Sequence, residues 1–182
     1  MGFGKAFLLS IVAFVGVNFI FTIIYYAIGP GFDVLFFNIQ NYPLVILYYL
    51  FGSIISTPSI IFDWIIVSPI LGAFLLPNLI LGLGYLAAPI VAAILAGRFG
   101  ESKGQCFGGW LLTAVISTVP VIIGTLLSPF TQLEISNIYG WWLPPPPSPP
   151  FEMILVFPII SCLINIIFYG LFALLISKIE YY

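Results

Sequence analysis

The sequence predicts an all-α integral membrane protein, a helical bundle of four long transmembrane helices plus an apolar re-entrant or tilted hairpin, with about six membrane-embedded segments. Hydrophobic residues form 62% of the 182-residue chain, whereas charged residues form only 5%. A soluble domain has about a quarter of its residues charged, because water must solvate its surface. The apolar residues also fall into runs of the length that a bilayer requires, about 20 residues. These observations predict a single membrane domain over residues 1–182.

Four apolar runs are long enough to cross a bilayer as helices, which rise about 1.5 Å per residue. They are predicted at residues 6–28, 77–97, 106–128 and 151–177. The first run is longer than the apolar region of a secretory signal, so we expect a retained helix. It ends at Gly29-Pro30-Gly31, a strong helix breaker. Between the last two spans we expect an outer loop, residues 129–150, whose proline run forms a stiff extended segment.

Residues 43–76 form one long apolar stretch that is interrupted by Asp63 and by several prolines. Its first part, Pro43–Phe62, is long enough to span a bilayer, but its second part, Trp64–Leu76, is too short. Basic residues concentrate in cytoplasmic loops, and this preference distinguishes the two topologies. An even number of crossings before Arg98 puts all the basic side chains on one side, whereas five simple crossings split them three to one. We therefore predict a membrane-embedded hairpin that enters and leaves by the same face.

The predicted topology makes the chain a multi-pass protein of the cell membrane with both termini in the cytoplasm. The basic residues that define this side are Lys5, Arg98, Lys103 and Lys178. Tyrosine and tryptophan concentrate at membrane interfaces. We therefore expect an outer belt of Tyr25, Tyr26, Tyr139, Trp141 and Trp142, and an inner group of Trp110, Tyr181 and Tyr182.

Small residues recur at four-residue spacing on two neighbouring spans. This small-residue stripe consists of Gly84, Ala88, Ala92 and Ala96 on one span, followed by Gly109, Thr113 and Ser117 on the next. Residues four apart share a helix face. Small side chains let helix backbones approach closely, and in lipid this packing drives helix association. The stripe is therefore predicted to pack helices, either by joining the two spans in a tight hairpin or by binding a partner.

Three polar residues interrupt apolar segments and are candidates for a polar or ion-coupling site. Asn18 and Asn165 lie near the middles of the first and last spans, and Asp63 lies within the hairpin. An amide in hydrocarbon needs a partner, and hydrogen bonds between helices contribute roughly 0.6 to 2 kcal/mol. An ionisable residue inside a membrane is a functional candidate by default. The alternative is that the amides join helices and that Asp63 reaches an interface.

The composition excludes several classes of function. The chain has no histidine, which excludes histidine-ligated haem, HExxH zinc sites and Ser–His or Cys–His nucleophile pairs. The two cysteines, Cys106 and Cys162, lie in apolar runs without metal-binding spacing. The net charge of −2 gives no footprint for nucleic acid. We expect no enzyme activity, no cofactor and no haem or metal, and we expect partners to be the lipid bilayer and other membrane proteins or further copies of the chain.

Two functions remain compatible with the sequence. The first is a non-catalytic, polytopic accessory subunit that packs with partner helices. The second is a small permease, or the substrate-binding membrane component of a transporter, with a polar site near the midplane. Convergence of polar groups distinguishes them, because a transport path needs several of Asn18, Asp63, Asn78 and Asn165 to face one cavity. So few polar residues in about six segments favour the accessory subunit.

Overall fold

The computed structural model describes residues 2–70, 76–139 and 151–177, and it is helical in every regular element of these ranges. Four helices are long and apolar enough to cross a membrane: α1 (Gly2–Ile28), α6 (Leu76–Phe99), α7 (Lys103–Leu127) and α9 (Phe151–Ile176). They occupy the four predicted spans: α1, α6 and α7 begin one to four residues earlier than predicted, and α7 and α9 end one residue earlier. The prediction of four long apolar helices is therefore confirmed.

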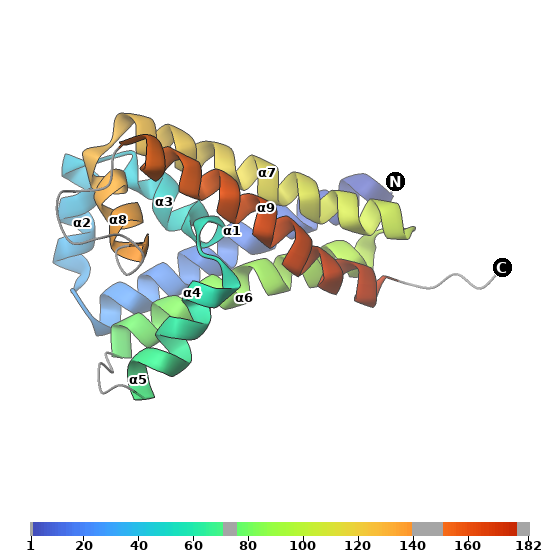
Figure 1. Cartoon of the computed structure of the whole chain (residues 1–182), viewed down its shortest axis with the longest axis horizontal. Coiled ribbons are helices and arrows are strands. Elements are labelled where there is room, and N and C mark those ends of the chain that lie inside the picture. Colours follow the sequence, from blue (N-terminus) through green and yellow to red (C-terminus); the bar gives the residue numbers. More distant parts are fainter. Residues whose placement is uncertain (1, 71–75, 140–150, 178–182) are drawn as a thin grey trace.

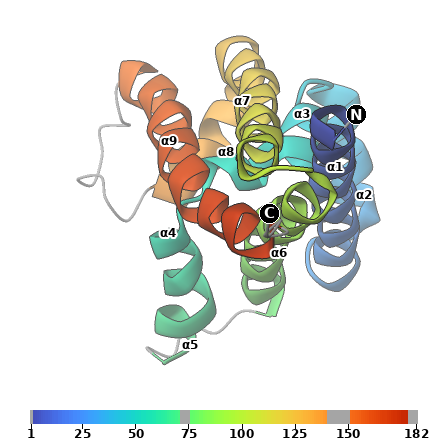
Figure 2. The ribbon, with the colours of Figure 1, turned by 90° about the vertical axis from the view of Figure 1, so that its right-hand side faces the viewer.

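The four long helices form a closed ring in the order α1, α6, α9 and α7, each packed against the next (Figure 2). Figure 1 shows what gathers at each end of this ring. The start of α1, the α6–α7 connection and the end of α9 lie at one end, which we call the basic end because Lys5, Arg98 and Lys103 belong to it. The opposite end carries the short helices α2 (Phe32–Asn41) and α8 (Pro129–Tyr139).

The predicted hairpin is a broken helical segment that turns back inside the bundle. It consists of α3 (Val45–Phe51), the short helix Gly52–Ile55, α4 (Pro58–Phe62), a π-helical turn (Asp63–Val67) and α5 (Ser68–Ile70). The two halves, Val45–Ile55 and Pro58–Val67, meet at an angle of 94°. The Gly52–Ile55 turn packs against α6, α7 and α9, and α4 and α5 return to the end where α6 begins (Figure 1). The segment therefore turns back before it reaches the basic end of the bundle.

Pro58 accounts for the break, and two neighbouring helices stabilise it. A proline disfavours the helical conformation of the residue before it, and Ser56 and Thr57 are extended, with ψ angles of 120° and 154°. Backbone carbonyls freed in this way need partners when they are buried. Asn165 of α9 donates from Nδ2 to the Ile54 and Ser56 carbonyls at 2.7 and 3.2 Å. The Tyr139 hydroxyl of α8 donates to the Ile55 carbonyl.

The connection predicted as an outer loop, residues 129–150, contains a short helix in its first half, because Pro129–Tyr139 forms α8. The Ser128 hydroxyl accepts a hydrogen bond from the Thr131 amide at 3.4 Å, and Pro129 at the first helical position suits a helix start. The segment after the first span is also helical, as α2. It begins beyond Gly31, whose φ of 93° lies in the region that favours glycine. Trp141, Trp142 and the proline run lie outside the described residues.

Several aromatic residues predicted to sit at membrane interfaces are buried inside the bundle. Trp110 is 0% exposed, and its indole N–H points at the Asn165 and Ile166 carbonyls, 3.3 Å from each. Tyr26 and Tyr139 are also buried. A buried Tyr or Trp needs a partner for its polar atom, and these three have one within the chain. These three side chains therefore face the interior of the bundle, and their depth in a membrane stays a prediction, while Tyr181 and Tyr182 lie outside the described residues.

Candidate functional site

A small polar cavity lies between α1, α3, α6 and α8, towards the end of the bundle that carries α2 and α8. We call it the tyrosine cavity. Its volume is about 50 Å³, and its lining residues are Thr22, Tyr25, Tyr26, Tyr48, Tyr49, Leu81, Tyr85 and Glu134. One water needs roughly 10 to 15 Å³ of such volume, so there is room for about three or four water-sized groups.

Hydrogen bonds between tyrosines build two sides of the cavity. The Tyr26 and Tyr49 hydroxyls share a hydrogen bond of 2.6 Å, and Asn38 of α2 donates to them from Nδ2 at 3.3 and 3.2 Å. The Tyr85 hydroxyl donates to the Tyr48 hydroxyl at 2.8 Å. Each pair uses only one of its two hydroxyl protons, because a hydroxyl has one proton to donate. One proton in each pair remains for an acceptor in the cavity.

Glu134 brings the only carboxyl group to the lining of this cavity. Within the described ranges, its side chain has no hydrogen bond and no ion pair, and the Tyr25 hydroxyl beside it also has no hydrogen-bond partner. Removal from water raises the pKa of Glu134 above its usual range. The carboxylate is therefore only partly solvated, and a positive charge in the cavity would stabilise it.

The distribution of charge along the bundle gives Glu134 no cation nearby. Asp33 opens α2, Glu134 lies in α8 and Glu152 opens α9, so these carboxyl groups gather at one end, which we call the acidic end (Figure 1). The described basic side chains belong to the basic end. Coulombic attraction is weak across the length of such a bundle. The negative charge at the tyrosine cavity is therefore not balanced from within the described part of the chain.

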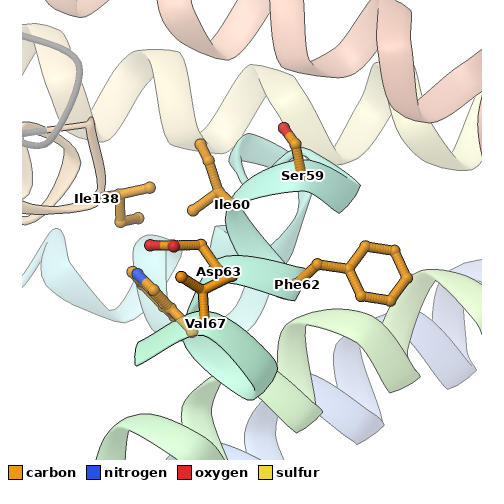
Figure 3. A pocket seen from close by; sticks show the side chains of 7 residues that line it. Ser59, Ile60, Phe62, Asp63, Val67 and Ile138 are labelled. Atoms are coloured by element: carbon orange, nitrogen blue, oxygen red, sulfur yellow. The ribbon is translucent and has the colours of Figure 1, made fainter. Parts of the chain in front are cut away.

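Asp63 lines a different and larger hollow, of about 350 Å³, between the second half of the hairpin and Ile138 of α8. The other lining residues are Ser59, Ile60, Phe62, Trp64, Val67 and Ile138. Figure 3 shows the Asp63 carboxyl pointing towards Ile138, while Phe62 points the opposite way. Asp63 is only partly buried, and the hollow is mostly apolar apart from Ser59, Asp63 and the Trp64 indole N–H. This hollow provides less polar contact for a ligand than the tyrosine cavity.

The polar residues singled out from the sequence do not share a cavity. Asn18 donates from Nδ2 to the Phe14 carbonyl of its own helix at 2.8 Å. Asn165 is committed to the hairpin carbonyls, and Asn78 is exposed. Neither Asn18 nor Asn165 lines the tyrosine cavity or the Asp63 hollow. The convergence that a transport path would require is therefore not found among these four residues.

The small-residue stripe is enclosed by the chain's own helices. All seven of its members are buried. A Cβ atom built on Gly84 would lie 2.5 Å from Phe21 Cβ of α1, and one on Gly109 would lie 3.0 Å from Ala6 Cβ of the same helix. α6 packs most extensively against α1, and α7 packs most extensively against α9. α6 and α7 also pack against each other, but α1 and α9 cover the stripe more extensively.

The sequence contained a signal for the tyrosine cavity, although Tyr48, Tyr49, Tyr85 and Glu134 were not predicted as site residues. Tyr48 and Tyr49 lie inside an apolar segment, and Tyr85 lies well inside the second long span. A phenol in hydrocarbon needs a hydrogen-bond partner, so tyrosines away from span ends predict a shared polar site. Glu134 gave no such signal, because its segment was expected to be an outer loop.

Comparisons with protein-family models, with curated protein sequences and with solved structures gave no match to this chain. Inference about its function therefore rests on the packing and chemistry of its own residues.

Proposed function

We propose that this chain is a non-catalytic, polytopic membrane protein that acts as an accessory subunit by packing against partner helices. The observation that supports this proposal is that the amide side chains within the predicted spans form hydrogen bonds to backbone carbonyls of the bundle itself. Asn165 holds the broken hairpin, Asn18 bonds its own helix, and Asp63 lies apart from both. These groups stabilise the bundle and do not line a shared path for a substrate.

The partner surface that we propose is the outer face of α1 around Gly16, because the small-residue stripe is already covered. α1 is the least enclosed of the four long helices, with 22% of its most apolar window buried. A Cβ atom on Gly16 would meet nothing within 4 Å. Val12, Phe19 and Ile20 are exposed around it. A glycine between large apolar residues lets a second helix approach closely in lipid.

Gly16→Leu tests this surface without disturbing the bundle. The added side chain fills open space, and leucine is a better helix former than glycine, so thermal stability in detergent should hold or rise slightly. The size of the complex extracted gently from native membranes, measured by native electrophoresis, should fall to that of the single chain. Val115→Leu, on the exposed face of α7, is the control and should leave the complex intact. An unchanged complex with Gly16→Leu would contradict the proposed surface.

The proposed orientation places the basic end in the cytoplasm, following the preference of Lys and Arg for that side. Cysteines introduced at Lys5, Ser102 or Lys178 should be shielded from an impermeant thiol reagent in intact cells. A cysteine at Ser148 should label. The native Cys106 and Cys162 are buried, which keeps the background low. Labelling of both Ser102 and Ser148 variants from outside would overturn this orientation.

A small permease or substrate-binding component is the second candidate, and the tyrosine cavity favours it. The cavity brings polar side chains from α1, α3, α6 and α8 to one place, beside the break in the hairpin segment. Transporter sites are often built beside broken helices. This candidate predicts uptake of a small solute into proteoliposomes that contain only this chain, whereas an accessory subunit alone gives none.

A further inference from the structure

The tyrosine cavity and the charge distribution together point to a ligand that neither function above specifies. We propose that the cavity binds a small monovalent cation, an alkali metal ion or an ammonium-type ion, against the Glu134 carboxylate. Binding of this kind requires no transport, so it stands independently of the subunit and permease proposals.

Charge complementarity is the first argument. Glu134 is the only carboxyl among the lining residues, and no basic residue lines the cavity with it. Its carboxylate forms no ion pair with the described part of the chain, whose lysines and arginine belong to the basic end. Desolvation raises the pKa of Glu134, so the charged form is destabilised while the cavity is without a cation. A bound cation would restore the charged form.

Ligand atoms are the second argument. Hydroxyl oxygens of Tyr25, Tyr48 and Tyr85 keep lone pairs that no described hydrogen bond occupies, so they offer neutral oxygen ligands beside the carboxylate. Aromatic rings surround the site, and ring faces attract cations. The edge-on contact of Tyr26 with both Tyr25 and Tyr49 holds three of these rings in place, with centroids 5.2 and 5.6 Å apart.

Size and charge define the class of cation. A cavity of about 50 Å³ admits a bare or partly hydrated monovalent ion, ammonium or methylammonium, and it excludes a bulky organic cation. Calcium and magnesium prefer six or more oxygen ligands with several carboxylates. One carboxylate among neutral phenols favours a single positive charge.

The test measures thermal unfolding of the full chain in detergent at constant ionic strength. Sodium, potassium, ammonium or methylammonium chloride is compared with N-methylglucamine chloride, whose cation is too large for the cavity. A small cation at ten times its dissociation constant should raise the unfolding midpoint by about 3 to 6 °C, since ligands that bind only the folded state stabilise it. Comparison of the midpoints in the alkali and ammonium salts identifies which cation the site prefers. Equal midpoints in all salts would overturn the proposal.

Glu134→Gln should abolish the midpoint shift, because it removes the charge and keeps the shape. Asp63→Asn is the matched control, since it removes the other carboxyl beside a hollow, and it should keep the full shift. An undiminished shift in Glu134→Gln would overturn the proposal.

A second measurement on the unaltered protein uses pH and does not depend on the variant folding. The shift should shrink as pH falls through the raised pKa of Glu134, because protons compete with the cation. The other ionisable groups that face Glu134 are Tyr25, Tyr26, Tyr48, Tyr49 and Tyr85, from α1, α3 and α6. Tyrosines stay protonated below about pH 10, so they do not contribute to this change. A shift that persists at acidic pH would contradict binding at the carboxylate.

Discussion

Asn165→Leu should lower the free energy of unfolding by about 2 to 4 kcal/mol, because it leaves two buried backbone carbonyls without partners. Asn165 is 0% exposed and donates to the Ile54 and Ser56 carbonyls at the break of the hairpin. Leucine has the same branched arrangement of side-chain heavy atoms as asparagine, and the same substitution at Asn18 controls for its larger volume. The substitution should also loosen the Gly52–Ile55 turn, where α6, α7 and α9 meet. Chemical unfolding in mixed micelles measures the change.

Asn18→Leu is the matched control, because it makes the same substitution at a buried amide of another span. Asn18 bonds only the Phe14 carbonyl, four residues earlier in its own helix. That carbonyl keeps its helical backbone partner after the substitution, so we expect a loss below about 1 kcal/mol. Equal losses from the two variants would show that Asn165 does not hold the hairpin.

The long helices were predictable from the sequence because lipid imposes a length and an apolar composition on a spanning helix. Pro129–Tyr139 has neither the length nor the apolar composition of a spanning helix. It is short, and it carries Thr131, Gln132, Glu134 and Ser136 among its apolar residues. Its helical form depends on the Ser128 cap and on tertiary contacts such as Gln132 Nε2 to the Thr125 carbonyl, at 2.9 Å. Contacts of this kind are set by the packed bundle and cannot be read from local composition.

The candidate site was less predictable because its residues are far apart in the chain and their partners follow from the course of the hairpin. Asn165 was expected to join helices, but its acceptors are carbonyls more than 100 residues away, at Ile54 and Ser56. Tyr26 was expected at an interface because it lies near the end of a span. The sequence did not indicate that the return of α3 beside α1 buries it against Tyr49. The sequence predicted which side chains need partners, and the hairpin determined which partners they find.

The backbones of α6 and α9 approach each other closely at Gly97, which follows the small-residue stripe. A Cβ atom there would lie 2.5 Å from the Ala173 carbonyl oxygen and 3.1 Å from the Ala173 Cα atom. Both are backbone atoms of a long helix, so they cannot move aside as a flexible side chain can. Gly97→Ala should therefore force α9 away from α6 and lower the free energy of unfolding by about 2 to 3 kcal/mol, near the upper end for overpacking.

Gly16→Ala separates this steric effect from helix propensity. Both glycines lie inside long helices, and alanine favours a helix over glycine by about 0.8 to 1 kcal/mol at either position. At Gly16 the new methyl group meets nothing within 4 Å, so this variant should be as stable as the original chain or more stable. Thermal unfolding of the three proteins in one detergent gives the comparison. If Gly97→Ala were as stable as Gly16→Ala, α6 and α9 would not be in backbone contact at Gly97.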